Sequence, residues 1–127
     1  MFTRKLFKRF RWSKEYPSNC PKSDVKEVSK MVVYRFVAND PPLADDFIPY
    51  SKLYPNRYAC CDGWGISFFK SEAMMKQKQL ANNSFKNMLI AKGVLETHDG
   101  KIKVSTSGHI NLWMYDRNDI HTKFKVI

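Results

Sequence analysis

The sequence predicts an α+β domain, in which a mixed or antiparallel sheet of about five to six strands packs against one main helix that could be split. Three observations predict it. A run of β-branched and aromatic residues fills positions 31–38, a helical stretch begins near residue 72, and the last third of the chain alternates apolar and polar residues as strands do. The chain has 127 residues, of which 43% are apolar, and this is enough for the core of one domain.

The first core element is "MVVYRFVA", residues 31–38, which ends where two prolines prevent further strand pairing. Both of its faces are apolar except at Arg35, so the strand is expected to be central. A charge on an apolar face needs a partner. A salt bridge from Arg35 to Asp45, Asp46 or Asp62 is the favoured interpretation.

Residues 39–62 contain four prolines and no clear hydrophobic period. They predict a long loop with one short helical turn at residues 43–47, and loops of this length are often functional. The apolar run "GISFF", residues 65–69, predicts a short buried strand.

The main helix is expected over residues 72–93. Ser71 can cap its first turn, and Gly93 is suited to the C-terminal cap. The sequence "ANNS" at residues 81–84 could divide it, because Ser84 is able to cap a second short helix.

Strands are expected to fill the rest of the chain. Residues 93–98 and 101–106 flank an Asp-Gly pair at 99–100, which is a strong signal for a two-residue hairpin turn. Residues 109–115 and 120–126 alternate in the manner of two further strands.

A basic, aromatic arm and linker is expected over residues 1–30, before a single domain over residues 31–127. The net charge is +10, and the first thirty residues carry nine basic against three acidic side chains. The expected binding residues of the arm are Arg4, Lys5, Lys8, Arg9, Arg11 and Trp12. Cations neutralise phosphates and aromatic rings stack on bases, so nucleic acid is a natural partner. The same pattern is typical of segments that bind an anionic membrane surface, or that pack on their own domain, a protein partner or a second copy.

The three cysteines, Cys20, Cys60 and Cys61, cannot all pair within one chain, so a reduced, cytoplasmic protein is expected. Cys60 and Cys61 are expected to be small buried residues at the entrance of a strand. The first residues are too charged for a signal peptide, and no stretch has the length of a membrane span. Cysteines and histidines at the close spacing of zinc ligands do not occur, so no metal site is expected.

A polar turn, Ser105-Thr106-Ser107-Gly108, has the composition of a phosphate-binding nest. Turns between strands commonly have the same composition, and this is the favoured interpretation.

One layout resembles a known group of proteins. "VVYRFV", "PPLADDFIP", "WGISFFKSEA" and "GHINLW", in this order, resemble small bacterial and phage-borne proteins of uncharacterised function. More distantly, the Tyr-Arg strand, the glycine-bearing strand and the "SEA" helix start over residues 31–75 are similar to the front half of the ADP-ribosyltransferase superfamily, which includes RES-type toxins that consume NAD.

This resemblance implies that Arg35 grips the phosphates of NAD, with Tyr34 and Trp64 as stacking partners. It also implies a late third-motif residue, for which His109, Asp116 and Glu96 are the candidates.

Two hypotheses follow. The first is a non-catalytic binding protein for an anionic partner such as nucleic acid, with no cofactor. The alternative is an ADP-ribosylating or NAD-consuming effector that uses Arg35 and His109 for catalysis and NAD as cofactor. The most informative observation for choosing between them is whether Arg35, Trp64 and His109 meet in one cleft or are separately buried.

Overall fold

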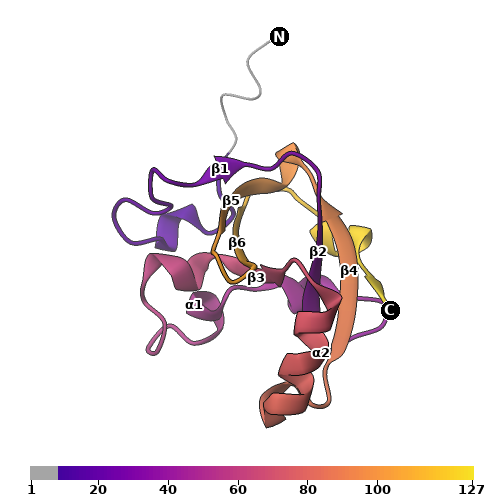
Figure 1. Cartoon of the computed structure of the whole chain (residues 1–127). Coiled ribbons are helices and arrows are strands. Elements are labelled where there is room, and N and C mark those ends of the chain that lie inside the picture. Colours follow the sequence, from indigo (N-terminus) through magenta and orange to yellow (C-terminus); the bar gives the residue numbers. More distant parts are fainter. Residues whose placement is uncertain (1–8) are drawn as a thin grey trace.

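The computed structural model describes residues 9–127, which form one seven-stranded antiparallel sheet with the strand order β1-β5-β6-β3-β2-β4-β7. Figure 1 shows that the sheet is strongly curved, and that β1, β5, β6, β3 and β2 follow one another around the curve. The strands are β1 (Lys26–Glu27), β2 (Met31–Val37), β3 (Ile66–Phe69), β4 (Leu89–Leu95), β5 (Gly100–Val104), β6 (His109–Met114) and β7 (Lys125–Val126). The α+β prediction is confirmed, with a slightly larger sheet than expected.

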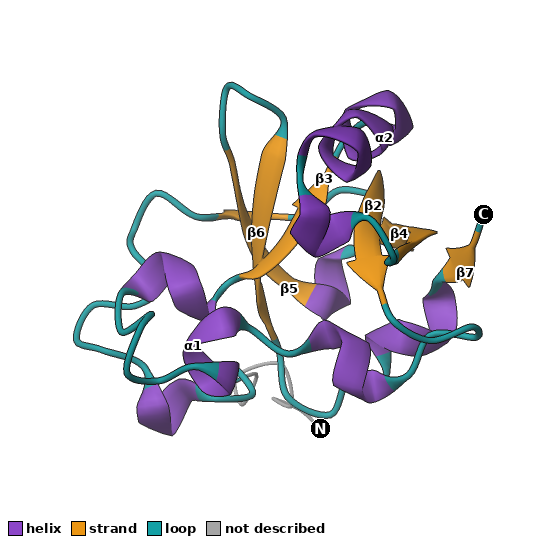
Figure 2. Cartoon of the chain, turned by 90° about the horizontal axis from the view of Figure 1, so that it is seen from below, coloured by secondary structure: helices purple, strands orange, loops and turns teal. Residues whose placement is uncertain are grey.

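Two α-helices and several 3-10 turns connect the strands. The α-helices are α1 (Tyr50–Leu53) and α2 (Glu72–Ala81). The 3-10 turns are Ser13–Glu15, Ala44–Phe47, Cys61–Trp64, Asn83–Phe85, Thr97–Asp99 and Ile120–Lys123. The turn at Ala44–Phe47 confirms the helical turn predicted within the long loop. α2 lies over β2 and β3 (Figure 2).

The main core lies on the concave face of the sheet. Alternate residues of neighbouring strands fill it, for example Val33, Phe68 and Leu112, each at most 1% exposed. A second cluster forms where Met75 of α2 packs on Phe36 and on other outward residues of the sheet. Burial on both faces makes β2 a central strand, as predicted, and it pairs with β4 along its whole length.

The predicted start of the helix is confirmed, but its predicted end is wrong. Ser71 Oγ accepts a hydrogen bond from Met74 N at 3.2 Å, and the helix ends at Ala81. Asn82 Oδ1 then accepts from Ser84 N at 2.9 Å, which starts a separate 3-10 turn at the predicted division. Leu89–Leu95 is strand β4, in which every residue pairs with a residue of β2. These long-range pairs favour the strand over a continuation of the helix.

The predicted hairpin at residues 99–100 does not form. β4 and β5 are not neighbours in the sheet, and β5 instead forms its hairpin with β6. The Asp99 side chain is fully buried and accepts hydrogen bonds from Glu96 N and from Lys123 Nζ. An ion pair between the partly exposed Lys123 and the buried Asp99 carboxylate therefore holds the Asp-Gly pair at a corner of the fold and not at an exposed tip.

The predicted strand at residues 120–126 is mostly a 3-10 turn. Ile120–Lys123 forms the turn, and only Lys125–Val126 pairs, as β7, with β4. Phe124 follows the turn and enters the main core, where its ring lies against Gly93, at which a Cβ would come within 2.7 Å of that ring. Core packing of Phe124 therefore decides this segment more than its alternating pattern.

Residues 9–30 pack on the domain along most of their length. Phe10 forms a β-bridge with Tyr115, β1 pairs with β5, and Val28 is 1% exposed within the main core. Residues 1–8 of the expected basic, aromatic arm lie outside the described residues. The segment from residue 10 onwards is part of the folded unit and not a linker that precedes it.

The expectation of three reduced cysteines is wrong. Cys20 and Cys61 form a disulfide although they lie 41 positions apart, and Cys60 is free and exposed, not buried. The N-terminal segment folds back over the turn at Cys61–Trp64, where Cys61 is buried as expected. The return of this segment brings the two sulfur atoms together, and no local pattern reveals such a return. No helix within residues 9–127 is long and apolar enough to cross a membrane.

Candidate nucleic-acid interface

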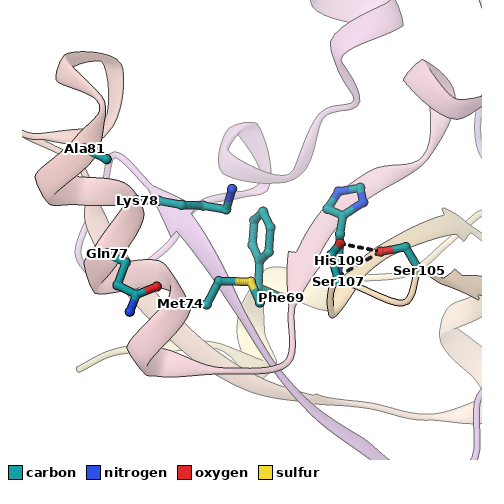
Figure 3. Close-up of a pocket in the computed structure, with 8 residues that line it drawn as sticks. All are labelled: Phe69, Met74, Gln77, Lys78, Ala81, Ser105, Ser107 and His109. Atoms are coloured by element: carbon teal, nitrogen blue, oxygen red, sulfur yellow. Dashed lines mark hydrogen bonds between the residues drawn. The ribbon is translucent and has the colours of Figure 1, made fainter.

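A pocket of about 700 Å³ lies between α2 and the turn that joins β5 to β6 (Figure 3). Its lining residues are Phe69, Met74, Gln77, Lys78, Ala81, Ser105, Ser107 and His109. They come from β3, from one side of α2, from the β5–β6 turn and from the start of β6. None of these eight described lining residues is acidic.

The register of the sheet places the two rings of the pocket side by side. Phe69 of β3 pairs with His109 of β6, so both side chains leave the same face of the sheet, and their ring centroids are 5.2 Å apart. On α2, Met74, Lys78 and Ala81 recur at helical spacing and form the facing wall.

The β5–β6 turn supplies two hydroxyl groups. Ser105 N donates to His109 O at 2.9 Å, and Gly108 N donates to Ser105 O at 3.1 Å, which closes the turn. Gly108 has a φ of +91°, a conformation that glycine adopts without strain. The hydroxyl oxygens of Ser105 and Ser107 lie 2.8 Å apart and line the pocket (Figure 3).

His109 is half-buried and shares a hydrogen bond of 2.9 Å between its Nε2 and the Oγ of Ser67, a neighbour on β3. Burial lowers the pKa of His109 below its ordinary 6.5, the nearby Lys78 lowers it further, and Asp62 acts in the opposite direction. The imidazole is therefore neutral at pH 7 and can accept a proton.

Lys78 carries the positive charge of the pocket. Its Nζ lies 5.1 Å from the centre of the Phe69 ring, a cation–π arrangement. Within the part of the chain that the structure describes, Lys78 has no ion pair, whereas Lys76 on the same helix pairs with Glu72 at 2.9 Å. Lys78 is thus a charge without an acidic partner there, held beside an aromatic ring.

Arg35 lies on the other face of the sheet and contributes to the core. Its Nε donates to Asp46 O at 2.8 Å, and its Nη1 donates to Ser67 O at 2.7 Å. The guanidinium carbon lies 5.6 and 5.8 Å from the ring centres of Phe47 and Phe68. Burial lowers the pKa of Arg35 to about 10, against which Tyr50 and Asp46 act.

Of the three aspartates expected as partners of Arg35, Asp46 does contact it, but not as a salt bridge. Asp46 is bound through its main-chain oxygen and not through its carboxylate, which accepts from Ala38 N and Leu43 N. No salt bridge joins Arg35 to a carboxylate of the described residues.

Trp64 and Tyr34 both serve packing. Trp64 is 6% exposed and packs with Cys61 and Trp113 beside the disulfide, while Tyr34 packs into the cluster beneath α2. Of Arg35, Trp64 and His109, His109 alone lines the pocket. These three residues therefore do not share that cleft.

The arm residues are divided between two situations. Arg4, Lys5 and Lys8 lie outside the described residues. Arg9 is exposed. Arg11 donates from Nη2 to Asn118 O at 2.7 Å and lies 3.8 Å from Asp116, and Trp12 packs partly into the core. Arg11 and Trp12 thus hold the segment on the domain.

The sequence did not point to Lys78, Phe69 or Gln77 as site residues, and for Ser105 and Ser107 it favoured an ordinary turn over a phosphate-binding nest. One signal was present: Lys78 recurs four positions after Met74 on the side of the helix that faces the sheet. The pairing of this side with the β5–β6 turn depends on long-range contacts.

No family model, curated protein or solved structure matches the chain. Among residues 9–127, no group of three or more acidic, histidine or cysteine side chains is arranged to hold a metal ion.

Proposed function

We propose that the protein binds single-stranded nucleic acid and that the pocket between α2 and the β5–β6 turn receives a phosphate and the adjoining base. The observation that carries this proposal is Lys78, an ammonium group without an acidic partner among the described residues, held 5.1 Å from the Phe69 ring. The ammonium group can neutralise a phosphate, and the aromatic ring can stack on a nucleobase.

The surroundings support the same ligand. The hydroxyls of Ser105 and Ser107 can donate to phosphate oxygens, and Phe69 and His109 offer two adjacent ring surfaces. The net charge of +10 attracts any polyanion over a longer range. Arg9, which is exposed, adds positive charge outside the pocket.

Fluorescence anisotropy with a labelled single-stranded oligonucleotide tests the proposal. Lys78→Ala should weaken binding. It should also make the negative slope of log affinity against log salt less steep by about 0.7 to 1, the amount expected for the loss of one phosphate contact. Lys76→Ala is the matched control, because Lys76 lies on the same helix but pairs with Glu72 and does not line the pocket. Equal effects of the two variants, or an affinity that does not change with salt, would refute the proposal.

The NAD-consuming alternative stays a prediction of the resemblance. Arg35, on which it depends, directs two of its donors to backbone carbonyl oxygens on the core side of the sheet. No specific feature of the pocket favours NAD over a nucleic acid.

A further inference from the structure

A proton donor, the Lys78 ammonium group, and a proton acceptor, the His109 imidazole, both lie beside the Phe69 ring of the pocket. The ammonium nitrogen of Lys78 lies 5.1 Å from the centre of the Phe69 ring, and the imidazole of His109 lies 5.2 Å from it. Figure 3 shows both side chains beside Phe69, Lys78 from α2 and His109 from β6. A proton acceptor and a cation thus stand next to the place proposed for a nucleotide.

The environment of His109 suits a general base. Its Nε2 is engaged by Ser67 Oγ at 2.9 Å, while its Nδ1 makes no hydrogen bond with any other described residue. If Nε2 carries the proton and donates it to Ser67, the lone pair lies on Nδ1. The pKa of the ring is lowered by burial and by Lys78, so the ring is in its accepting form at neutral pH.

Ser67 acts as a positioning residue. Its hydroxyl lies at a distance typical of a nucleophile and its base, but Ser67 does not line the pocket. A substrate there would meet His109 first. RNA carries its own nucleophile, the ribose 2′-hydroxyl, which needs only a base to activate it.

We propose that this pocket cleaves single-stranded RNA, with His109 as the general base and Lys78 as the group that stabilises charge on the phosphate and then protonates the leaving 5′ oxygen. The inference rests on the proposed binding of nucleic acid and adds the substrate class and a reaction. It would make the protein an enzyme and not a binding module alone.

The step balances with the groups at hand. His109 Nδ1 takes the proton of the 2′-hydroxyl, the 2′ oxygen forms a bond to the adjacent phosphorus, and the bond from phosphorus to the 5′ oxygen breaks. The 5′ oxygen takes a proton from the Lys78 ammonium group, which regains one from water, and His109 releases its proton to solvent. The products are a 2′,3′-cyclic phosphate and a 5′-hydroxyl end. No oxidant or cofactor is consumed.

The experiment compares two oligonucleotides of one sequence, incubated with the full chain. One is RNA, whose cleavage is followed by the ends it produces. The other carries 2′-O-methyl groups at every ribose, so it can bind but cannot react. We expect the wild-type protein to bind both and to leave cyclic phosphate and 5′-hydroxyl ends on the RNA alone.

Variants assign the activity to the pocket. His109→Gln should lower the cleavage rate about 100-fold or more, the usual effect of removing a general base, while binding of the methylated oligonucleotide persists. His98→Gln, purified in the same way, is the matched control and should cleave as the wild type does, because His98 is exposed and outside the pocket. Lys78→Ala, a change at a partly exposed position, should also lower the rate and provides a second test if the His109 variant folds poorly.

The outcomes separate the two proposals. Binding of both oligonucleotides with intact RNA would overturn the cleavage proposal and leave the binding proposal standing. Failure to bind either oligonucleotide would overturn both. Cleavage that survives equally in His109→Gln and Lys78→Ala would show that the activity arises elsewhere, and would also overturn the inference.

Discussion

Removal of the disulfide between Cys20 and Cys61 should destabilise the protein by about 4 kcal/mol. The bond closes a loop with a sequence separation of 41 residues. In the chain-entropy model, closing a loop of that length lowers the conformational entropy of the unfolded state by about 13 cal/mol/K. At 25 °C this corresponds to a free energy of about 4 kcal/mol. Domains of this size are usually stable by about 5–15 kcal/mol, so the loss is a large fraction of the total.

Cys20→Ala tests this magnitude in air-oxidised protein. Urea unfolding can be followed by tryptophan fluorescence, because Trp64 and Trp113 pack in the same cluster as Cys61. Cys60→Ser is the control, since Cys60 is free and exposed, and its effect should stay within about 0.5 kcal/mol. Thiol titration of the denatured, oxidised wild type should find only the thiol of Cys60.

The reasoning would be refuted by either of two results. One is a loss of less than about 1 kcal/mol in oxidised Cys20→Ala, which would show that the loop closure contributes little. The other is three reactive thiols in the oxidised wild type, which would show that Cys20 and Cys61 do not pair.

Two further predictions concern the two faces of the sheet. The pKa of His109 should lie below 6.5 in an NMR titration and should rise in Lys78→Ala, since that cation lowers it; an unchanged value would contradict the pocket's geometry. Because folded His109 takes up its proton at lower pH than the unfolded chain does, its contribution to stability is complete above about pH 6.5 and declines as pH falls through the window below it. Arg35→Met should destabilise the protein by about 2–4 kcal/mol in urea, because it leaves two carbonyl oxygens unpaired on the core side. The same variant should leave oligonucleotide affinity unchanged, and a large loss of affinity without a loss of stability would contradict the structural role of Arg35.

Several elements could be predicted because local chemistry decides them. Residues 31–38 are rich in β-branched and aromatic side chains, and they form the central strand β2. Ser71 caps the helix that follows β3, as its position before Glu72 indicates. In these places side-chain shape, turn chemistry and burial all favour the same structure.

Other elements could not be predicted, because their structure depends on contacts with residues distant in the sequence. Leu89–Leu95 has the apolar spacing of a helix, but it becomes β4 because the edge of β2 offers it a full ladder. The Asp-Gly pair at 99–100 has the composition of a hairpin tip, but Lys123 binds the Asp99 carboxylate in the interior.

The sequence by itself determined the α+β class, the central strand, the start of the main helix and the basic character of the protein. Tertiary structure alone decided that Cys20 reaches Cys61, that Arg35 turns to the core, and that Lys78 meets Phe69 and His109. The physical reason is the range of the interactions. Propensities and caps act within a few residues, whereas the pocket and the disulfide depend on which surfaces remain to be buried after the strands have paired.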